Sequence, residues 1–182
     1  VEYMDHVSDT IYAAFKVKVS NLDIIKGADV IIWTTTPWTI PANKALAYNA
    51  GLKYVLLEIN DNKNFTGRKI VIAKDLLEPF KKDTSIENIK VLNEFLGKDL
   101  KGTICSHPFS KMGYDYDIPM LEANFVTTEQ GTGIVHCAPS HGPDDFNLCL
   151  NNNIKAIETV DGDGKYTNAV SYTHLRAHET QL

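Results

Sequence analysis

Residues 28–43 read ADVIIWTTTPWTIPAN, and this stretch decides how the chain is laid out. Its first half is rich in β-branched and aromatic residues, which predicts a buried strand that ends at the proline of position 37. Successive side chains of a strand face opposite ways, so Thr34 and Thr36 are expected on one face, although the bend before the proline could re-aim Thr36. Two prolines restrict the backbone around Trp38. We therefore expect a stiff loop that holds its polar groups in place.

On either side of this stretch, several short segments are also rich in β-branched and aromatic residues and are separated by Gly, Asn or Asp. The strands expected from it are 11–19, 28–35, 53–59, 68–73, 122–127 and 133–137. A hairpin with a long loop is predicted at 61–67, and helices are predicted at 74–82 and 144–152. Many short strands and few helices predict a mostly β, α+β fold: a compact, β-barrel-like or curled sheet with a few peripheral helices. The regular alternation of a doubly wound sheet is missing.

The chain has 182 residues, which suits one domain, expected over 1–168. The polar segment 169–182 is expected to be a tail that is disordered or foreign to the natural protein. Without an initiator Met, the chain is expected to be a fragment. No apolar run approaches the roughly 20 residues that cross a bilayer, so no membrane association is expected. Three cysteines without a CxxC pair indicate a reducing, cytoplasmic compartment.

The net charge of −5 argues against a protein that binds nucleic acid by broad phosphate neutralisation. It is compatible with a domain that receives only the end of an RNA delivered by a larger partner.

A second informative stretch is residues 131–146, GTGIVHCAPSHGPDDF. Two glycines allow close approach of the backbone, a short buried strand follows, and a Gly/Pro loop leads into an acidic helix start, which is a common location for functional sites. Each residue also has a purely structural explanation. His136 could be a buried core histidine, Asp144 a helix cap and Asp145 a partner of the helix dipole. The threonines of the first stretch could simply be strand formers, with Trp38 filling a core.

Metal binding is the sharpest rival hypothesis for this second stretch. Its possible ligands are His136, Cys137, His141 and Asp145. The two histidines are not spaced for one helical face, and adjacent His136 and Cys137 would point to opposite faces of a strand. Nucleophilic catalysis is also weakly supported, because there is no GxSxG motif and Cys137 has no evident activating group apart from the neighbouring histidine.

Taken together and in this order, the two stretches resemble the editing insertion of the class I aminoacyl-tRNA synthetases for branched aliphatic amino acids. Leucyl and valyl members typically have Thr-Thr-Arg-Pro followed by an acidic residue. Here Thr36 stands in place of the arginine and Trp38 in place of the acid, which is the isoleucyl pattern. His136 is likewise expected in isoleucyl members and not in the other two. The resemblance covers most of residues 1 to 168.

Two departures from the family pattern are informative. The adenylate-forming motifs HIGH and KMSKS are absent, so this fragment is not expected to activate an amino acid. Cys137 occupies a position where a threonine is expected, a mild change that should leave the neighbouring His136 in place.

The resemblance implies hydrolysis of mischarged valyl-tRNA(Ile), and of valyl-adenylate as a further substrate. One methylene separates valine from isoleucine and is worth about 1–3 kcal/mol; double-sieve editing was formulated for these very synthetases. Asp145 would hold the α-ammonium group of the substrate, and Trp38 and His136 would shape the side-chain pocket. Thr34, Thr35 and Thr36 would bind the aminoacyl group or the terminal ribose. Asn43 would position the adenosine end or the attacking water.

The implied catalytic set is Asp145, His136 and Thr36, with His136 and a ribose hydroxyl of the substrate as equal candidates for the base. No metal, no cofactor and no covalent intermediate are implied. The implied partners are the 3′ end of aminoacylated tRNA and the rest of a parent synthetase, and we expect a monomer. Two alternatives stay open: a module that binds aminoacyl-RNA or an amino acid without turnover, and a metal-dependent hydrolase at residues 136–145.

Overall fold

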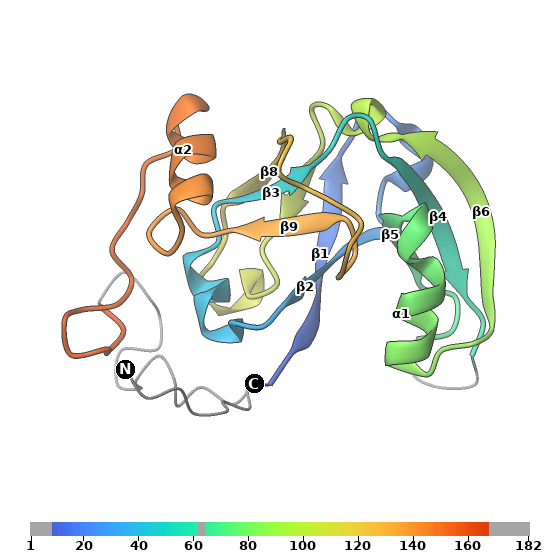
Figure 1. Ribbon diagram of the computed structural model, residues 1–182, viewed down its shortest axis with the longest axis horizontal. Helices are drawn as coiled ribbons and strands as arrows, with labels where there is room; N and C mark the ends of the chain where they lie inside the picture. The colour runs from blue at the N-terminus through green and yellow to red at the C-terminus, as the bar shows by residue number, and fades with distance from the viewer. Residues whose placement is uncertain (1–8, 62–64, 168–182) are drawn as a thin grey trace.

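The computed structural model describes residues 9–61 and 65–167, which form a nine-stranded mixed sheet with two α-helices (Figure 1). The strands are β1 Ile11–Val19, β2 Asp29–Thr34, β3 Ala45–Tyr48, β4 Lys53–Ile59, β5 Lys69–Ala73, β6 Ile89–Leu96, β7 Ile104–Ser106, β8 Asp117–Glu122 and β9 Ile134–Cys137. The α-helices are α1 Leu77–Thr84 and α2 Pro143–Asn151, and short 3-10 helices cover Asp23–Ile25, Pro37–Ala42, Lys74–Leu76, Gly97–Leu100 and Ser110–Met112.

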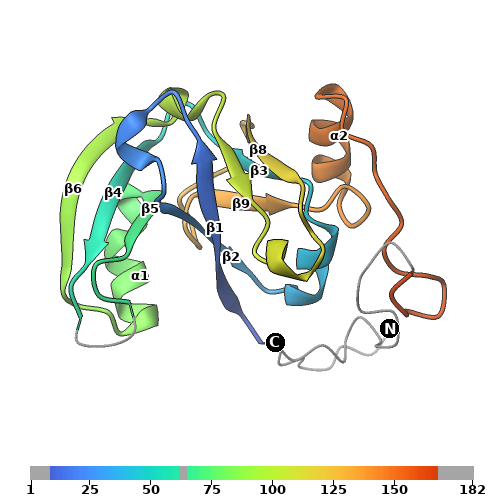
Figure 2. The same cartoon turned by 180° about the vertical axis from the view of Figure 1, so that it is seen from behind.

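The strands follow the order β6-β4-β5-β2-β1-β7-β8-β3-β9. The pairs β2–β5 and β3–β8 are parallel, and the other pairs are antiparallel. The mostly β class with few helices is confirmed. The sheet is open, with β6 and β9 as its edges, so a closed barrel is not confirmed. The helices lie at opposite ends of the sheet, α1 over β4 and β5 and α2 beyond β9 (Figures 1 and 2).

The two faces of β1 serve different cores. Phe15 and Val17 point into the main core. Tyr12 and Ala14 point to the other face, where the Tyr12 ring meets the ring of Phe80 from α1 with centroids 5.3 Å apart. This alternation is what a strand with two buried faces requires. It explains why β1 carries apolar residues along most of its length.

Several strands lie where the sequence predicts them, and others do not. The bounds of β1 and β4 match the prediction, and β2 and β5 begin one residue later than predicted. The strand predicted at 122–127 is wrong, because β8 ends at Glu122 and residues 123–127 are irregular. Ala123 and Val126 are apolar because they belong to a buried cluster that includes Cys149 of α2, not because they belong to a strand. The prediction for 169–182 falls outside the described residues.

The residues just before β9 pack closely against Ala73 at the end of β5. Gly133 has a φ of +70°, and a Cβ atom there would lie 2.4 Å from the Cβ of Ala73, so only glycine fits. The Ala73 N–H donates to the carbonyl of Thr132 at 2.8 Å, and the Tyr54 hydroxyl donates to the carbonyl of Gly133 at 2.7 Å. This close approach places the end of β9 beside the end of β2.

Candidate functional site

A half-open cavity of about 300 Å³ lies between the end of β2 and the connection from β9 to α2. Its lining residues are Trp33, Thr34, Thr35, Thr36, Trp38, Thr39, Val135, His136, Ala138, His141 and Asp145. Six of the seven residues predicted as a site therefore meet in one cavity. The seventh, Asn43, is fully buried and is not among the lining residues.

One wall of the cavity is formed by residues 34–36, three consecutive threonines at the end of β2. The Thr36 N–H donates to Thr34 Oγ1 at 3.0 Å, and the two hydroxyl oxygens lie 3.2 Å apart. The two hydroxyls lie on the same side, as predicted, although Thr36 lies beyond the end of β2 and not within the strand. After Thr36 the backbone turns into the 3-10 helix Pro37–Ala42, as a proline at its first position favours. The two hydroxyls therefore stand side by side at the point where the strand ends.

His136 sits in a continuous set of hydrogen bonds. Asn43 Nδ2 donates to His136 Nδ1 at 2.6 Å and to the carbonyl of Ala45 at 3.0 Å. His136 Nε2 lies 2.9 Å from Thr39 Oγ1, and the Thr39 hydroxyl donates to the carbonyl of Thr36 at 2.8 Å. Because Nδ1 accepts a hydrogen bond from an amide N–H, the imidazole hydrogen belongs on Nε2 and points to Thr39 Oγ1. Asn43 thus fixes the tautomer of His136.

This environment keeps His136 neutral. Its side chain is buried, and burial lowers its pKa from 6.5 to about 3, with a smaller contribution from the neighbouring His107 and His141. A histidine with both ring nitrogens hydrogen-bonded and so low a pKa is a poor proton acceptor at neutral pH. The geometry gives no support to His136 as a general base. It supports His136 as a fixed part of the wall.

Acid should destabilise the protein through its buried histidines. Burial lowers the pKa of His136 to about 3 and that of His107 to about 4, each from 6.5. Below pH 6.5 the unfolded chain binds these protons and the folded chain does not, so the free energy of unfolding falls as the pH falls. The loss is about 1.4 kcal/mol per pH unit for each histidine. Urea unfolding between pH 7 and pH 4.5 measures it. A slope that the His107→Phe variant does not reduce would contradict this assignment.

Asp145 forms the opposite wall of the cavity, on the first turn of α2. Its Oδ2 accepts a hydrogen bond from the Ala138 N–H at 2.8 Å, which orients the carboxylate toward the cavity rather than toward its own helix. Partial burial raises the pKa of Asp145 above its usual 3.8, and the nearby Asp144 adds to this, while the Ala138 bond opposes it. It is the single carboxylate among the described residues that line the cavity. This wall is therefore suited to bind a cationic group.

Two further polar residues line the cavity: Thr39, which the sequence did not indicate, and His141, which it indicated only as a possible metal ligand. Thr39 is buried and bonds His136 across 97 positions of the chain. The ring of His141 lies perpendicular to that of Trp38, with centroids 5.2 Å apart, and its Nε2 is 2.8 Å from Thr159 Oγ1. Both lie inside the two stretches singled out from the sequence, but nothing in their spacing indicated these contacts.

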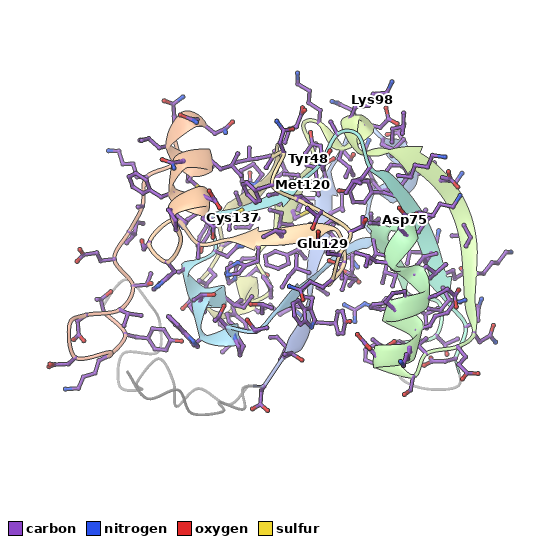
Figure 3. All side chains as sticks on the ribbon, viewed as in Figure 1. Tyr48, Asp75, Lys98, Met120, Glu129 and Cys137 are labelled. Atoms are coloured by element: carbon purple, nitrogen blue, oxygen red, sulfur yellow. The ribbon has the colours of Figure 1, made fainter. Side chains whose placement is uncertain are left out.

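The rival chemistries find little support in this geometry. In residues 9–61 and 65–167, no group of three or more His, Cys, Asp or Glu side chains is arranged to hold a metal ion. Cys137 is buried at the α2 end of β9 (Figure 3), and burial raises the pKa of its thiol. A protonated buried thiol is a poor nucleophile. None of the described helices has the length and apolar character needed to traverse a bilayer.

The fold is similar to that of solved synthetase editing domains. The crystal structure of the P. knowlesi cytosolic leucyl-tRNA synthetase editing domain matches with a TM-score of 0.60 and 15% sequence identity, covering 84% of this chain and 69% of that one. The corresponding domain of P. falciparum, in space group P1, matches with a TM-score of 0.54 and 18% identity, over 75% of this chain and 52% of that one. At this identity the likeness shows a common fold.

Sequence comparison is more specific. The family model described as leucyl-tRNA synthetase, editing domain, matches residues 45–181. The isoleucine–tRNA ligase of Pelagibacter ubique (strain HTCC1062) is 69% identical over 92% of this chain, and that of Gluconobacter oxydans (strain 621H) is 44% identical over 91% of it. The chain spans about 18% of the length of each. It belongs to the family of synthetase editing domains, in the form found in isoleucine–tRNA ligases.

Proposed function

We propose that this domain hydrolyses valyl-tRNA(Ile), and valyl-adenylate as a second substrate, and so proofreads isoleucine attachment within a parent synthetase. One observation carries the proposal: Asp145 and the hydroxyls of Thr34 and Thr36 line the same cavity of about 300 Å³, together with His136. A carboxylate facing a pair of hydroxyls fits a ligand that carries an ammonium group beside an ester.

The walls of the cavity correspond to the parts of an aminoacyl ester. Asp145 binds the α-ammonium group by a charge-assisted hydrogen bond. Thr34, Thr35 and Thr36 bind the ester and the terminal ribose, because their hydroxyls can both donate and accept. The rings of Trp38 and His136 enclose the side chain. Asn43 does not touch the substrate in this proposal; it holds the ring of His136 in position.

The attacking nucleophile in this proposal is a water molecule. Its oxygen bonds to the acyl carbon, the bond from that carbon to the ribose oxygen breaks, and the ribose leaves as a free hydroxyl. Both nitrogens of His136 are engaged by Asn43 and Thr39, so we assign the proton that the attacking water loses to a free ribose hydroxyl of the substrate, which passes it to the departing ribose oxygen. The protein supplies position more than acid–base chemistry, and positioning alone can lower a barrier greatly.

Small esters provide the direct test, because most of the parent synthetase is missing from this chain. Release of valine from a valyl ester of adenosine is measured at high protein concentration and compared with release of isoleucine from the matching ester. We expect the valyl ester to be cleaved faster. A folded chain that cleaves neither ester would exclude the hydrolytic function.

Recognition without turnover is the second candidate. It is favoured by one observation, which is that both ring nitrogens of His136, a candidate base, are engaged by Asn43 and Thr39. Calorimetry with a non-hydrolysable valyl-adenosine analogue distinguishes the two: tight binding combined with no ester cleavage would establish a binding module.

A further inference from the structure

The segment that follows α2 folds back onto the outer side of the cavity. Residues 157–167, called the strap here, form a small hairpin in which Val160 pairs with Tyr166 and the Thr167 N–H donates to the carbonyl of Thr159 at 3.0 Å. Asp161 Oδ1 closes the turn by accepting from the N–H groups of Asp163 and Lys165. The strap therefore has its own internal hydrogen bonds.

One side of the strap supports the Trp38 loop, the segment Pro37–Ala42 that forms a 3-10 helix. The Tyr166 hydroxyl donates to the backbone carbonyl of Trp38 at 2.7 Å, across 128 positions of the chain. The Tyr166 ring is 4% exposed and packs in a cluster with Tyr114, Val160 and Trp38 itself. A buried hydroxyl aimed at a backbone carbonyl fixes the position of that backbone.

The other side of the strap supports the loop between β9 and α2. Thr159, which is 4% exposed, places its hydroxyl oxygen 2.8 Å from His141 Nε2. Ser140, next to His141, donates its hydroxyl to the carbonyl of Ile157. The strap thus holds both loops whose rings, Trp38 and His141, meet edge to face in the cavity wall.

We propose that the strap is a positioning element for the aminoacyl group, and that Tyr166 and Thr159 set the width of the cavity by fixing the wall of Trp38 and His141. The proposal rests on the function proposed above and assigns part of its selectivity. Neither residue lines the cavity, so both act through the rings that they hold. The wall is built on two loops rather than on paired strands, so its position depends on what supports it from behind.

The test removes single hydroxyl groups and leaves the packing in place. Tyr166→Phe keeps the ring in its cluster, and Thr159→Val keeps the branched shape. Two matched controls make the same chemical changes at the α1 end of the molecule: Tyr12→Phe, which removes a hydroxyl bonded to Asp83, and Thr84→Val, which removes one bonded to the Phe80 carbonyl.

Two measurements separate positioning from general stability. Calorimetry gives the ratio of affinities for non-hydrolysable valyl-adenosine and isoleucyl-adenosine analogues. Tryptophan emission in a Trp33→Phe background reports the surroundings of Trp38, since the chain has two tryptophans. Each strap variant should lower the preference for the valyl analogue by about two- to tenfold, the effect of one hydrogen bond. Tyr166→Phe should also shift the Trp38 emission, and the controls should change neither quantity.

A wild-type affinity ratio in both strap variants would overturn the proposal, even if both proteins were less stable. Wild-type chain that binds the valyl analogue but cleaves no ester would remove the hydrolytic function and leave the strap to be judged by the affinity ratio. Absence of binding to either analogue would overturn both.

Discussion

Asp145→Asn should lower kcat/KM for the valyl ester by roughly 10²–10³-fold, because the cavity loses its one carboxylate and the α-ammonium of the ester then has no counter-charge. Asparagine has nearly the same shape and its carbonyl can still accept from the Ala138 N–H. The fold and the orientation of the side chain should therefore survive. Initial rates of valine release over a range of ester concentrations measure the effect.

Asp144→Asn is the matched control for this variant. It makes the same change of charge on the same helical turn, but Asp144 is exposed and does not line the cavity. Its kcat/KM should stay within about twofold of wild type, as surface substitutions usually do. If kcat/KM fell equally in the two variants, the total negative charge at the start of α2 would explain the effect. The role of Asp145 in binding the α-ammonium group would then be wrong.

His136→Ala should admit isoleucine. The imidazole forms part of the wall and is fixed by Asn43 and Thr39, so its removal widens a cavity of about 300 Å³ by most of a ring. The preference for valyl over isoleucyl ester should fall by on the order of ten- to a hundredfold, the scale on which pockets distinguish one methylene. The protein should also lose about 2–5 kcal/mol of stability, because the substitution leaves a cavity and a buried amide without its acceptor.

His107→Ala controls for that loss of stability. His107 is also buried, stacks on Tyr114 and is bonded to the Ile40 carbonyl, but it lies outside the cavity. It should unfold at a lower urea concentration than wild type and keep the preference for the valyl ester. If its selectivity fell as far as that of His136→Ala, loosening of the whole domain rather than the missing ring would explain the result.

The local parts of the site could be predicted from the sequence, and the contacts between them could not. The hydroxyls of Thr34 and Thr36 lie side by side where β2 ends, because the Thr36 N–H donates back to Thr34 Oγ1, and such a contact between residues two positions apart is within reach of sequence reasoning. The burial of Asn43 is different. Its partner lies 93 positions away, and the 3-10 helix before it turns the amide behind His136 instead of into the cavity.

Two of the four strands that the sequence did not predict, β3 and β6, share a physical cause, and the other two are β7 and β8. Every residue of β3, Ala45–Tyr48, is buried, so both faces are apolar and no alternation marks it. At the sheet edge, β6 is exposed along most of Ile89–Leu96 and carries polar residues on both faces. In both cases position within the sheet decides the pattern, and that position depends on pairings with distant strands.

The strap affects when this domain can complete its folding during translation. The loop that carries Trp38 is synthesised early. The Tyr166 hydroxyl that bonds to the Trp38 carbonyl is synthesised 128 positions later. Translation adds about 5–20 residues per second, so roughly 6 to 26 s pass between the two. During that interval the nascent polypeptide has no finished cavity, so the hydrolysis proposed above requires that nearly all of this region has been synthesised.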